Sequence, residues 1–219
     1  MVYRETKLRD EFMDLLFSEE DMEAARRWFL NNPASEGPGL HAYYIGRNKR
    51  ILKAAEFCLE RYPGDLAEIG CYSGASTRPL AGLAEEYGRR MIAVDPWIVD
   101  PKAHCHEDTY EKWQLNTKPV AHVIDEVRQK SQSEEAIAYL KSRQLAFVYV
   151  DGLHNYEAAY TDYLTVSHCN GIIAADDINW PRPDMWRALW DAARITGREI
   201  VWYPNCVEGY LLPIKSPET

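Results

Sequence analysis

Two nearly continuous apolar runs, each ending in a carboxylate, place the strongest constraint on the fold. Residues 145–151 read Leu-Ala-Phe-Val-Tyr-Val-Asp, and residues 171–177 read Gly-Ile-Ile-Ala-Ala-Asp-Asp. A strand that is apolar on both faces must be covered on both sides, which is typical of parallel strands in α/β proteins. We therefore expect helices on both faces of a mostly parallel sheet.

Shorter segments of the same kind recur along the chain and complete this sheet. Further strands are expected at 65–70, at 90–95, near Val127, and as a closing pair at 199–203 and 209–214. Helices are expected between or beside these strands, at 48–62, 79–87, 109–116, 133–140 and 185–196. The alternation of strands and helices from residue 48 onward predicts a doubly wound α/β fold with a mostly parallel seven-stranded sheet.

The first 47 residues are expected to form an N-terminal helical extension to a main domain at 48–219. A helical stretch is expected over 18–32, and Pro33 together with the Pro38-Gly39 pair breaks the pattern, which leaves a loop before the main domain. We expect this extension to cover the substrate side as a lid, or to pair with a second subunit in a homo-oligomer.

Composition narrows the class of partner. The chain has 219 residues, 25 basic and 34 acidic side chains, and a formal net charge of −9. Binding to a nucleic-acid backbone requires a basic patch, which no stretch supplies, so a small-molecule partner is favoured. No apolar run approaches the ~20 residues of a membrane span, and we expect a soluble, cytoplasmic protein. The five cysteines are odd in number and form no Cys-x-x-Cys pair, so packed, reduced thiols are expected.

Carboxylates mark the ends of four expected strands. They are Glu68, Asp95, Asp151 and the Asp176-Asp177 pair. In open α/β sheets, ligands bind beyond the carboxyl ends of the strands. The sequence therefore predicts one acidic site at that edge of the sheet.

The turn after the first strand combines two glycines with an acid at the end of the next strand. It reads Glu68-Ile-Gly70-Cys-Tyr72-Ser-Gly74-Ala-Ser76, and Asp95 ends the following strand. A dinucleotide-binding turn needs glycine where Tyr72 stands, because the backbone must closely approach a pyrophosphate, so Tyr72 argues against NAD. The pattern resembles the cofactor motif of class I S-adenosylmethionine-dependent methyltransferases, which implies a Rossmann-like fold.

This resemblance implies which residues contact S-adenosylmethionine. The glycine turn would lie along the methionine moiety, and Asp95 would accept hydrogen bonds from both ribose hydroxyls, since a carboxylate suits a vicinal diol. The residues implied in the turn are Glu68, Gly70, Tyr72, Gly74 and Ser76. The alternative is structural: the glycines make a tight strand-to-helix turn, and Asp95 caps the segment that follows.

Later motifs narrow the resemblance to the metal-dependent branch that contains catechol and sugar O-methyltransferases. The stretch 147–157 reads Phe-Val-Tyr-Val-Asp-Gly-Leu-His-Asn-Tyr-Glu, and the second acidic strand end is Asp176-Asp177. Many members of that branch hold magnesium at these two strand ends, which implies Asp151, Asp176 and Asp177 as ligands of Mg²⁺ or another divalent cation. Oxygen ligands suit such a hard cation. The alternative for Asp176-Asp177 is a turn or helix-capping pair.

Other residues near the strand ends are candidates for catalysis and binding. His154 could accept the acceptor's proton near neutral pH, with Asp151 beside it, or could hydrogen-bond a neighbouring loop. Ser133, with Gln132, is placed by the resemblance near the adenine, and Ser133 would also cap a helix. Trp97 could stack on the adenine or serve as packing.

Three segments have weaker signals. The run His104-Cys105-His106-Glu107-Asp108 has no standard zinc spacing and is interpreted as a loop near the substrate. Trp180 and the segment 43–47 (Tyr-Tyr-Ile-Gly-Arg) are candidates for the substrate wall, with core or lid packing as the alternative.

We therefore expect an S-adenosylmethionine-dependent O-methyltransferase, assisted by Mg²⁺, that acts on a hydroxyl of a sugar, a glycosylated natural product or a catechol-like small molecule. A metal ion would lower the pKa of the attacking hydroxyl. One alternative is a metal-independent enzyme with His154 as the base. Another is a non-catalytic binding module with a methyltransferase fold.

Overall fold

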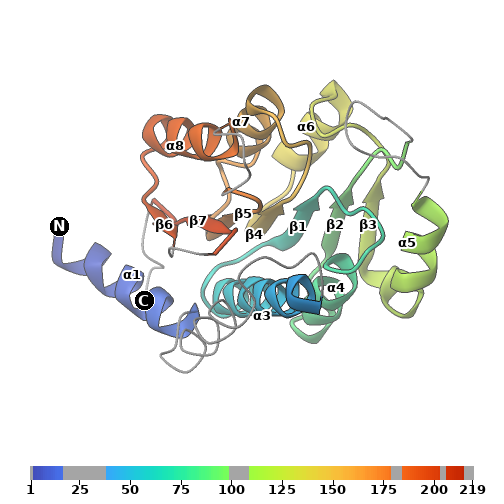
Figure 1. Cartoon of the computed structure of the whole chain (residues 1–219), viewed down its shortest axis with the longest axis horizontal. Coiled ribbons are helices and arrows are strands. Elements are labelled where there is room, and N and C mark those ends of the chain that lie inside the picture. Colours follow the sequence, from blue (N-terminus) through green and yellow to red (C-terminus); the bar gives the residue numbers. More distant parts are fainter. Residues whose placement is uncertain (1, 17–37, 99–108, 179–183, 203–205, 215–219) are drawn as a thin grey trace.

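A single seven-stranded sheet runs through the molecule in the order β3-β2-β1-β4-β5-β7-β6 (Figure 1). The computed structural model describes residues 2–16, 38–98, 109–178, 184–202 and 206–214. The strands are β1 (Asp65–Ile69), β2 (Met91–Val94), β3 (Ile124–Val127), β4 (Leu145–Val150), β5 (Ile172–Ala175), β6 (Ile200–Trp202) and β7 (Gly209–Leu211). Strands β1 to β5 are parallel, while β7 is antiparallel to both β5 and β6. The mostly parallel sheet and the closing strand pair confirm the prediction.

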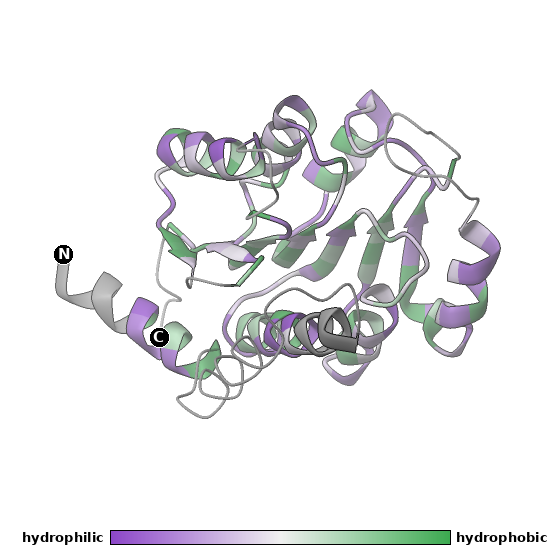
Figure 2. Ribbon diagram, in the orientation of Figure 1, coloured by the Kyte–Doolittle hydropathy of each residue, from purple (hydrophilic) through white to green (hydrophobic). Residues whose placement is uncertain are grey.

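Helices cover both faces of this sheet. Helices α3 (Pro38–Arg61) and α4 (Thr77–Glu86) lie on one face, and α6 (Glu134–Lys141), α7 (Tyr156–Thr165) and α8 (Asp184–Thr196) lie on the other (Figure 1). Helix α5 (Tyr110–Thr117) and the 3₁₀ segment η2 (Lys118–Val123) lie beyond β3, and α1 (Val2–Leu16) lies at the opposite end. In Figure 2 the strands are largely hydrophobic, and polar residues lie on the outer helices. This is the doubly wound arrangement expected from the alternating elements.

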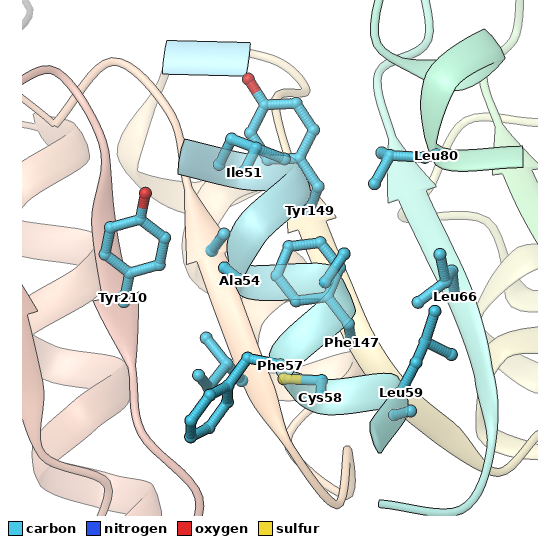
Figure 3. Close-up of a cluster of buried hydrophobic side chains, with 14 of the residues drawn as sticks. Ile51, Ala54, Phe57, Cys58, Leu59, Leu66, Leu80, Phe147, Tyr149 and Tyr210 are labelled. Atoms are coloured by element: carbon cyan, nitrogen blue, oxygen red, sulfur yellow. The ribbon is translucent and has the colours of Figure 1, made fainter. Parts of the chain in front are cut away.

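Strand β4 divides the core into two layers. Phe147 and Tyr149 pack with the buried face of α3, whereas Val148 and Val150 pack with α6, α7 and α8. Figure 3 shows the first layer, in which α3 presents Ala54 and its neighbours to these rings. All four β4 side chains are at most 1% exposed, because alternate residues of a strand point to opposite faces and both faces are covered.

Helix α3 begins ten residues earlier than the sequence pattern predicts. We expected Pro38-Gly39 to belong to a loop, but Pro38 is the first residue of α3. Proline is tolerated at the first helical position, because the N–H it lacks would have no partner within the helix. The predicted division between residues 47 and 48 therefore falls inside one continuous helix.

The N-terminal helix α1 shares the main core. The Phe12 ring lies 5.5 Å from that of Phe57 and 5.2 Å from that of Tyr210, and Leu16 is fully buried. The helix predicted over 18–32 falls outside the described residues. A lid or oligomer role for the extension stays a prediction. None of the helices in the described residues is long and apolar enough to cross a membrane.

Candidate functional site

The carboxyl ends of β1 and β4 meet at Gly70. Its N–H donates to the carbonyl oxygen of Val94 at 2.9 Å, and the Asp151 N–H donates to the Ile69 carbonyl at 2.8 Å. Gly70 has φ 88°, in the left-handed region that favours glycine. Strand β1 has β2 on one side and β4 on the other, so the order reverses here, which is where ligands bind in such sheets.

Asp95 holds the glycine turn through three backbone hydrogen bonds. Its Oδ2 accepts from the N–H groups of Cys71 at 2.9 Å and Tyr72 at 3.0 Å, and its Oδ1 accepts from the Trp97 N–H at 2.7 Å. Burial raises the pKa of the Asp95 carboxyl, and the three N–H donors act against that shift. Asp95 thus caps the segment that follows it, through the Trp97 N–H. A carboxylate oxygen can accept more than one hydrogen bond, so Oδ1 can also accept from a ligand hydroxyl.

Glu68 lies beneath the turn rather than in the open site. The side chain is fully buried, and its two oxygens accept hydrogen bonds from the hydroxyls of Ser76 and Thr77. Burial raises the pKa of Glu68 to about 7, although both hydroxyl hydrogen bonds favour the charged form. Thr77 was not singled out from the sequence, since one threonine at the start of a helix carries no distinctive pattern.

Aromatic rings support the same turn. Trp97 is 2% exposed, its ring lies 4.5 Å from that of Trp113, and its Nε1–H donates to the Tyr72 carbonyl at 2.9 Å. A Cβ on Gly74 would lie 3.0 Å from Trp113 Cδ1. Trp97 is therefore packed beneath the turn, and its contact with adenine stays a prediction, while Tyr72 is 54% exposed.

Gln132 and Ser133 lie in the turn that enters α6. The Ser133 hydroxyl oxygen accepts from the Ala136 N–H at 3.2 Å, which is the predicted helix cap. The Gln132 amide nitrogen donates to Ser131 Oγ at 2.6 Å and to Asp162 Oδ1 at 2.8 Å. Asp162 is 1% exposed, and burial raises its pKa to about 7.

His154 lies between two of the predicted carboxylates. Its Nε2 is 3.6 Å from Asp151 Oδ1, and its Nδ1 is 3.5 Å from Asp177 Oδ2. Ligand atoms of these three side chains all lie within 4.8 Å of one another, which is compatible with one shared metal ion. Burial alone would lower the pKa of the imidazole, but the nearby carboxylates of Asp151 and Asp177 outweigh burial, so the pKa of His154 is raised.

Asp176, the remaining member of the predicted metal set, pairs with an arginine. Arg47 Nη1 donates to Asp176 Oδ2 and lies 3.9 Å from Asp151 Oδ2. The Asp176 side chain is 1% exposed and that of Arg47 is 12% exposed, so the pair is largely withdrawn from water. Asp151 and Asp177 belong both to the predicted metal set and to the group formed with His154, whereas Asp176 is paired with Arg47. Asp176 as a metal ligand stays a prediction.

Arg47 was not predicted as a site residue, although its segment was a candidate for the substrate wall. The side chains of Tyr43 and Tyr44 fall outside those that the structure describes. The same is true of Trp180 and of the segment 104–108, so the interpretations of these residues stay predictions.

Comparisons with known proteins agree on the fold. A family model described as a methyltransferase domain matches residues 67–178, from β1 to just beyond the Asp176-Asp177 pair. The solved O-methyltransferase TomG from Streptomyces achromogenes, involved in tomaymycin synthesis and in complex with SAM, is 14% identical. The match covers 95% of this chain and 96% of that chain, with a TM-score of 0.53. No curated protein matches the chain.

Two further solved structures have comparable TM-scores and sequence identities. A putative RNA methyltransferase, PH1948 from Pyrococcus horikoshii, is 11% identical over 82% of this chain and 86% of that chain, with a TM-score of 0.51. The CurJ carbon methyltransferase is 14% identical over 95% of this chain and 61% of that chain, also with a TM-score of 0.51. At such identities the likeness shows the fold, and the three names refer to different acceptors.

Proposed function

The chain belongs to the methyltransferase-domain family and is an S-adenosylmethionine-dependent methyltransferase, and we propose that it methylates a hydroxyl of a small molecule. The acceptor class is a sugar, a glycosylated natural product or a catechol-like phenol. The observation that carries this proposal is His154 between Asp151 and Asp177 at the carboxyl ends of β4 and β5. A hydroxyl must lose its proton to attack a methyl group well, and this cluster offers both a proton acceptor and cation ligands.

The β1 end of the site fits S-adenosylmethionine. Asp95 lies beside the glycine turn, and its Oδ1, which accepts from the Trp97 N–H, can also accept from a ribose hydroxyl. Gln132, whose two amide N–H groups are already used, would offer its carbonyl oxygen to the adenine. A cationic sulfonium would be favoured close to the Asp151 carboxylate.

A divalent cation fits the β4 end. Asp151, Asp177 and His154 would hold it, as a mixed set of oxygen and nitrogen ligands that Mn²⁺ accepts at least as readily as Mg²⁺. When bound, such an ion would lower the pKa of an acceptor hydroxyl. The metal set implied by resemblance also contains Asp151 and Asp177, so these two carboxylates are the proposed ligands in either case.

The metal-independent route is the second candidate, favoured by the position of His154. Its imidazole would take the hydroxyl proton, and the two carboxylates would stabilise the resulting imidazolium. The acceptor oxygen would form a bond to the methyl carbon while the carbon–sulfur bond breaks, and its electron pair would remain on sulfur. The products are a methyl ether, S-adenosylhomocysteine and the proton held by His154.

The test begins with calorimetry of S-adenosylhomocysteine binding and continues with methyl transfer from labelled S-adenosylmethionine to catechol and to a panel of glycosides. The matched control for each acceptor carries a methoxy group in place of the hydroxyl. We expect label only on acceptors with the free hydroxyl, and activity lost in EDTA and restored by Mg²⁺ or Mn²⁺. Label on nitrogen or carbon would contradict hydroxyl methylation.

The response to added metal separates the two routes, because His154 contributes to both. If His154 is the base, His154→Gln should lower kcat about 10²- to 10⁴-fold with or without added metal, and kcat of the wild type should rise with pH through a pKa above that of an ordinary imidazole. If the cation activates the hydroxyl, Asp177→Asn should raise the metal concentration needed for half-maximal activity. Activity that survives EDTA and Asp177→Asn unchanged would exclude the metal-assisted route.

A further inference from the structure

Arg47 places a positive charge where the sequence predicts a metal ion. It belongs to α3, whereas its partner Asp176 directly follows β5, 129 residues further along the chain. The guanidinium contacts Asp176 Oδ2 and lies 3.9 Å from Asp151 Oδ2, so it faces two of the three carboxylates in the predicted metal set.

Asp176 needs a positive partner because of its surroundings. The residue is fully buried, and burial together with the negative charge of Asp151 raises its pKa, while Arg47 acts in the opposite direction. An ionised carboxylate in such a place is costly unless it is paired. Among the described residues, its second oxygen, Oδ1, is buried and has no hydrogen-bond partner. Within the part of the chain that the structure describes, Asp176 is thus paired through one oxygen, and its other oxygen has no donor.

We propose that Arg47 and a divalent cation compete for the Asp176 carboxylate, so that Arg47 weakens metal binding at this site. The proposal deepens the proposed function, on which it rests, because it concerns the same metal site. A guanidinium and a metal ion cannot both bind Oδ2 closely, and their positive charges repel. A cation held only by Asp151, His154 and Asp177 keeps Arg47 in place, whereas one that also takes Asp176 must displace it.

The anchoring of α3 indicates that displacement would move the Arg47 side chain and leave the helix in place. One turn further on, Arg50 donates to the fully buried Glu208, which fixes α3 to the strand β7 region. Ile51, Ala54 and Ala55 are at most 2% exposed in the core beneath the helix. The pair Arg50 and Glu208 has the same chemistry and similar burial, which makes Arg50 a matched control for Arg47.

The test measures Mn²⁺ binding to the protein without cofactor or acceptor, by calorimetry or by electron paramagnetic resonance. We expect Arg47→Gln to bind Mn²⁺ at least about tenfold more tightly than the wild type, since a competing unit charge is removed within ~4 Å of the site. The double variant Arg47→Gln/Asp176→Asn should lose that gain. Arg50→Gln should stay within about twofold of the wild type.

Arg47→Lys is a second variant that keeps a positive charge, so it tests the proposal even if Arg47→Gln folds poorly. It should bind Mn²⁺ within about threefold of the wild type. Equal Mn²⁺ affinity in Arg47→Gln and wild type, or no Mn²⁺ binding in Arg47→Gln, would overturn the proposal. So would a gain that persists in the double variant. The Mn²⁺ binding experiment measures no methyl transfer. If the proposed acceptor chemistry is wrong, the activity assay will show it, and the Mn²⁺ affinities will still test the competition with Arg47.

Discussion

The carbonyl oxygen of Asp151 occupies the space that a Cβ atom on Gly70 would need, at only 2.0 Å from that position. This contact joins the end of β1 to the end of β4, the two strands between which the sheet order reverses. Gly70 also has φ 88°, which L-residues rarely adopt. Both observations require glycine, independently of any ligand.

Gly70→Ala is therefore expected to destabilise the cofactor-free protein by about 2–5 kcal/mol. The left-handed backbone contributes about 1–2 kcal/mol and the steric overlap about 1–3 kcal/mol. Gly88→Ala is the matched control, because Gly88 has φ 64° but nothing within 4 Å of its virtual Cβ. Urea unfolding should give only about 1–2 kcal/mol for that control. Equal losses at both positions would show that the approach of Asp151 imposes no steric cost.

Asp95→Ala should lower stability even without cofactor. The substitution removes the acceptor for three backbone N–H groups in the β1–α4 turn and after β2. Hydrogen bonds to charged groups are each worth about 1.5–3 kcal/mol and are not additive, so we expect a loss of about 2–4 kcal/mol. Unfolding in urea without ligand measures it. A variant of wild-type stability that only binds S-adenosylhomocysteine more weakly would mean that Asp95 acts on the cofactor alone.

Glu68 should make stability fall as pH rises. Its pKa is about 7 in the folded protein and 4.5 ordinarily, so between these values the folded state holds the proton more tightly than the unfolded state. The free energy of unfolding then decreases from about pH 5 to pH 7, by on the order of 3 kcal/mol from this group. Glu68→Gln, which keeps an oxygen acceptor, should remove this part of the pH dependence. Parallel stability curves for wild type and variant would contradict the raised pKa.

The strands, and their burial on both faces, could be predicted from the sequence because each strand shows a local pattern of apolar residues. The runs that end at Asp151 and Asp177 are apolar on both faces, and only a sheet covered on both sides accommodates them. The convergence of their terminal acids follows from parallel strand direction. His154 lies three residues after Asp151, so its proximity to Asp151 is also a local consequence.

Contacts made across the chain could not be predicted in the same way. Arg47 reaches Asp176 because α3 begins at Pro38 and crosses β4 and β5, and no local pattern encodes that crossing. Glu68 was expected in the open site, but Ser76 and Thr77 turn back over it and bury it. Trp97 was a candidate for stacking on adenine, and its burial depends on Trp113 from a separate helix.

Asp162 fixes the orientation of the Gln132 amide, which predicts a selective effect on cofactor binding. The amide nitrogen donates its two N–H groups to Ser131 and Asp162, which leaves the carbonyl oxygen as the acceptor. In the proposed cofactor site, this oxygen would accept from the 6-amino group of adenine. Asp162→Ala should release the amide and weaken S-adenosylhomocysteine binding about three- to tenfold, the worth of one hydrogen bond.

S-inosylhomocysteine, which has an oxygen in place of that amino group, separates orientation from general damage to the site. Its affinity should change less in Asp162→Ala than that of S-adenosylhomocysteine, because it offers no amino donor for Gln132 to accept from. Asp162→Asn keeps an oxygen that can accept from Gln132, and should preserve the preference for adenine in calorimetry. If both ligands weakened equally in Asp162→Ala, the substitution would have disturbed the turn into α6, and Gln132 would not be the residue that distinguishes adenine.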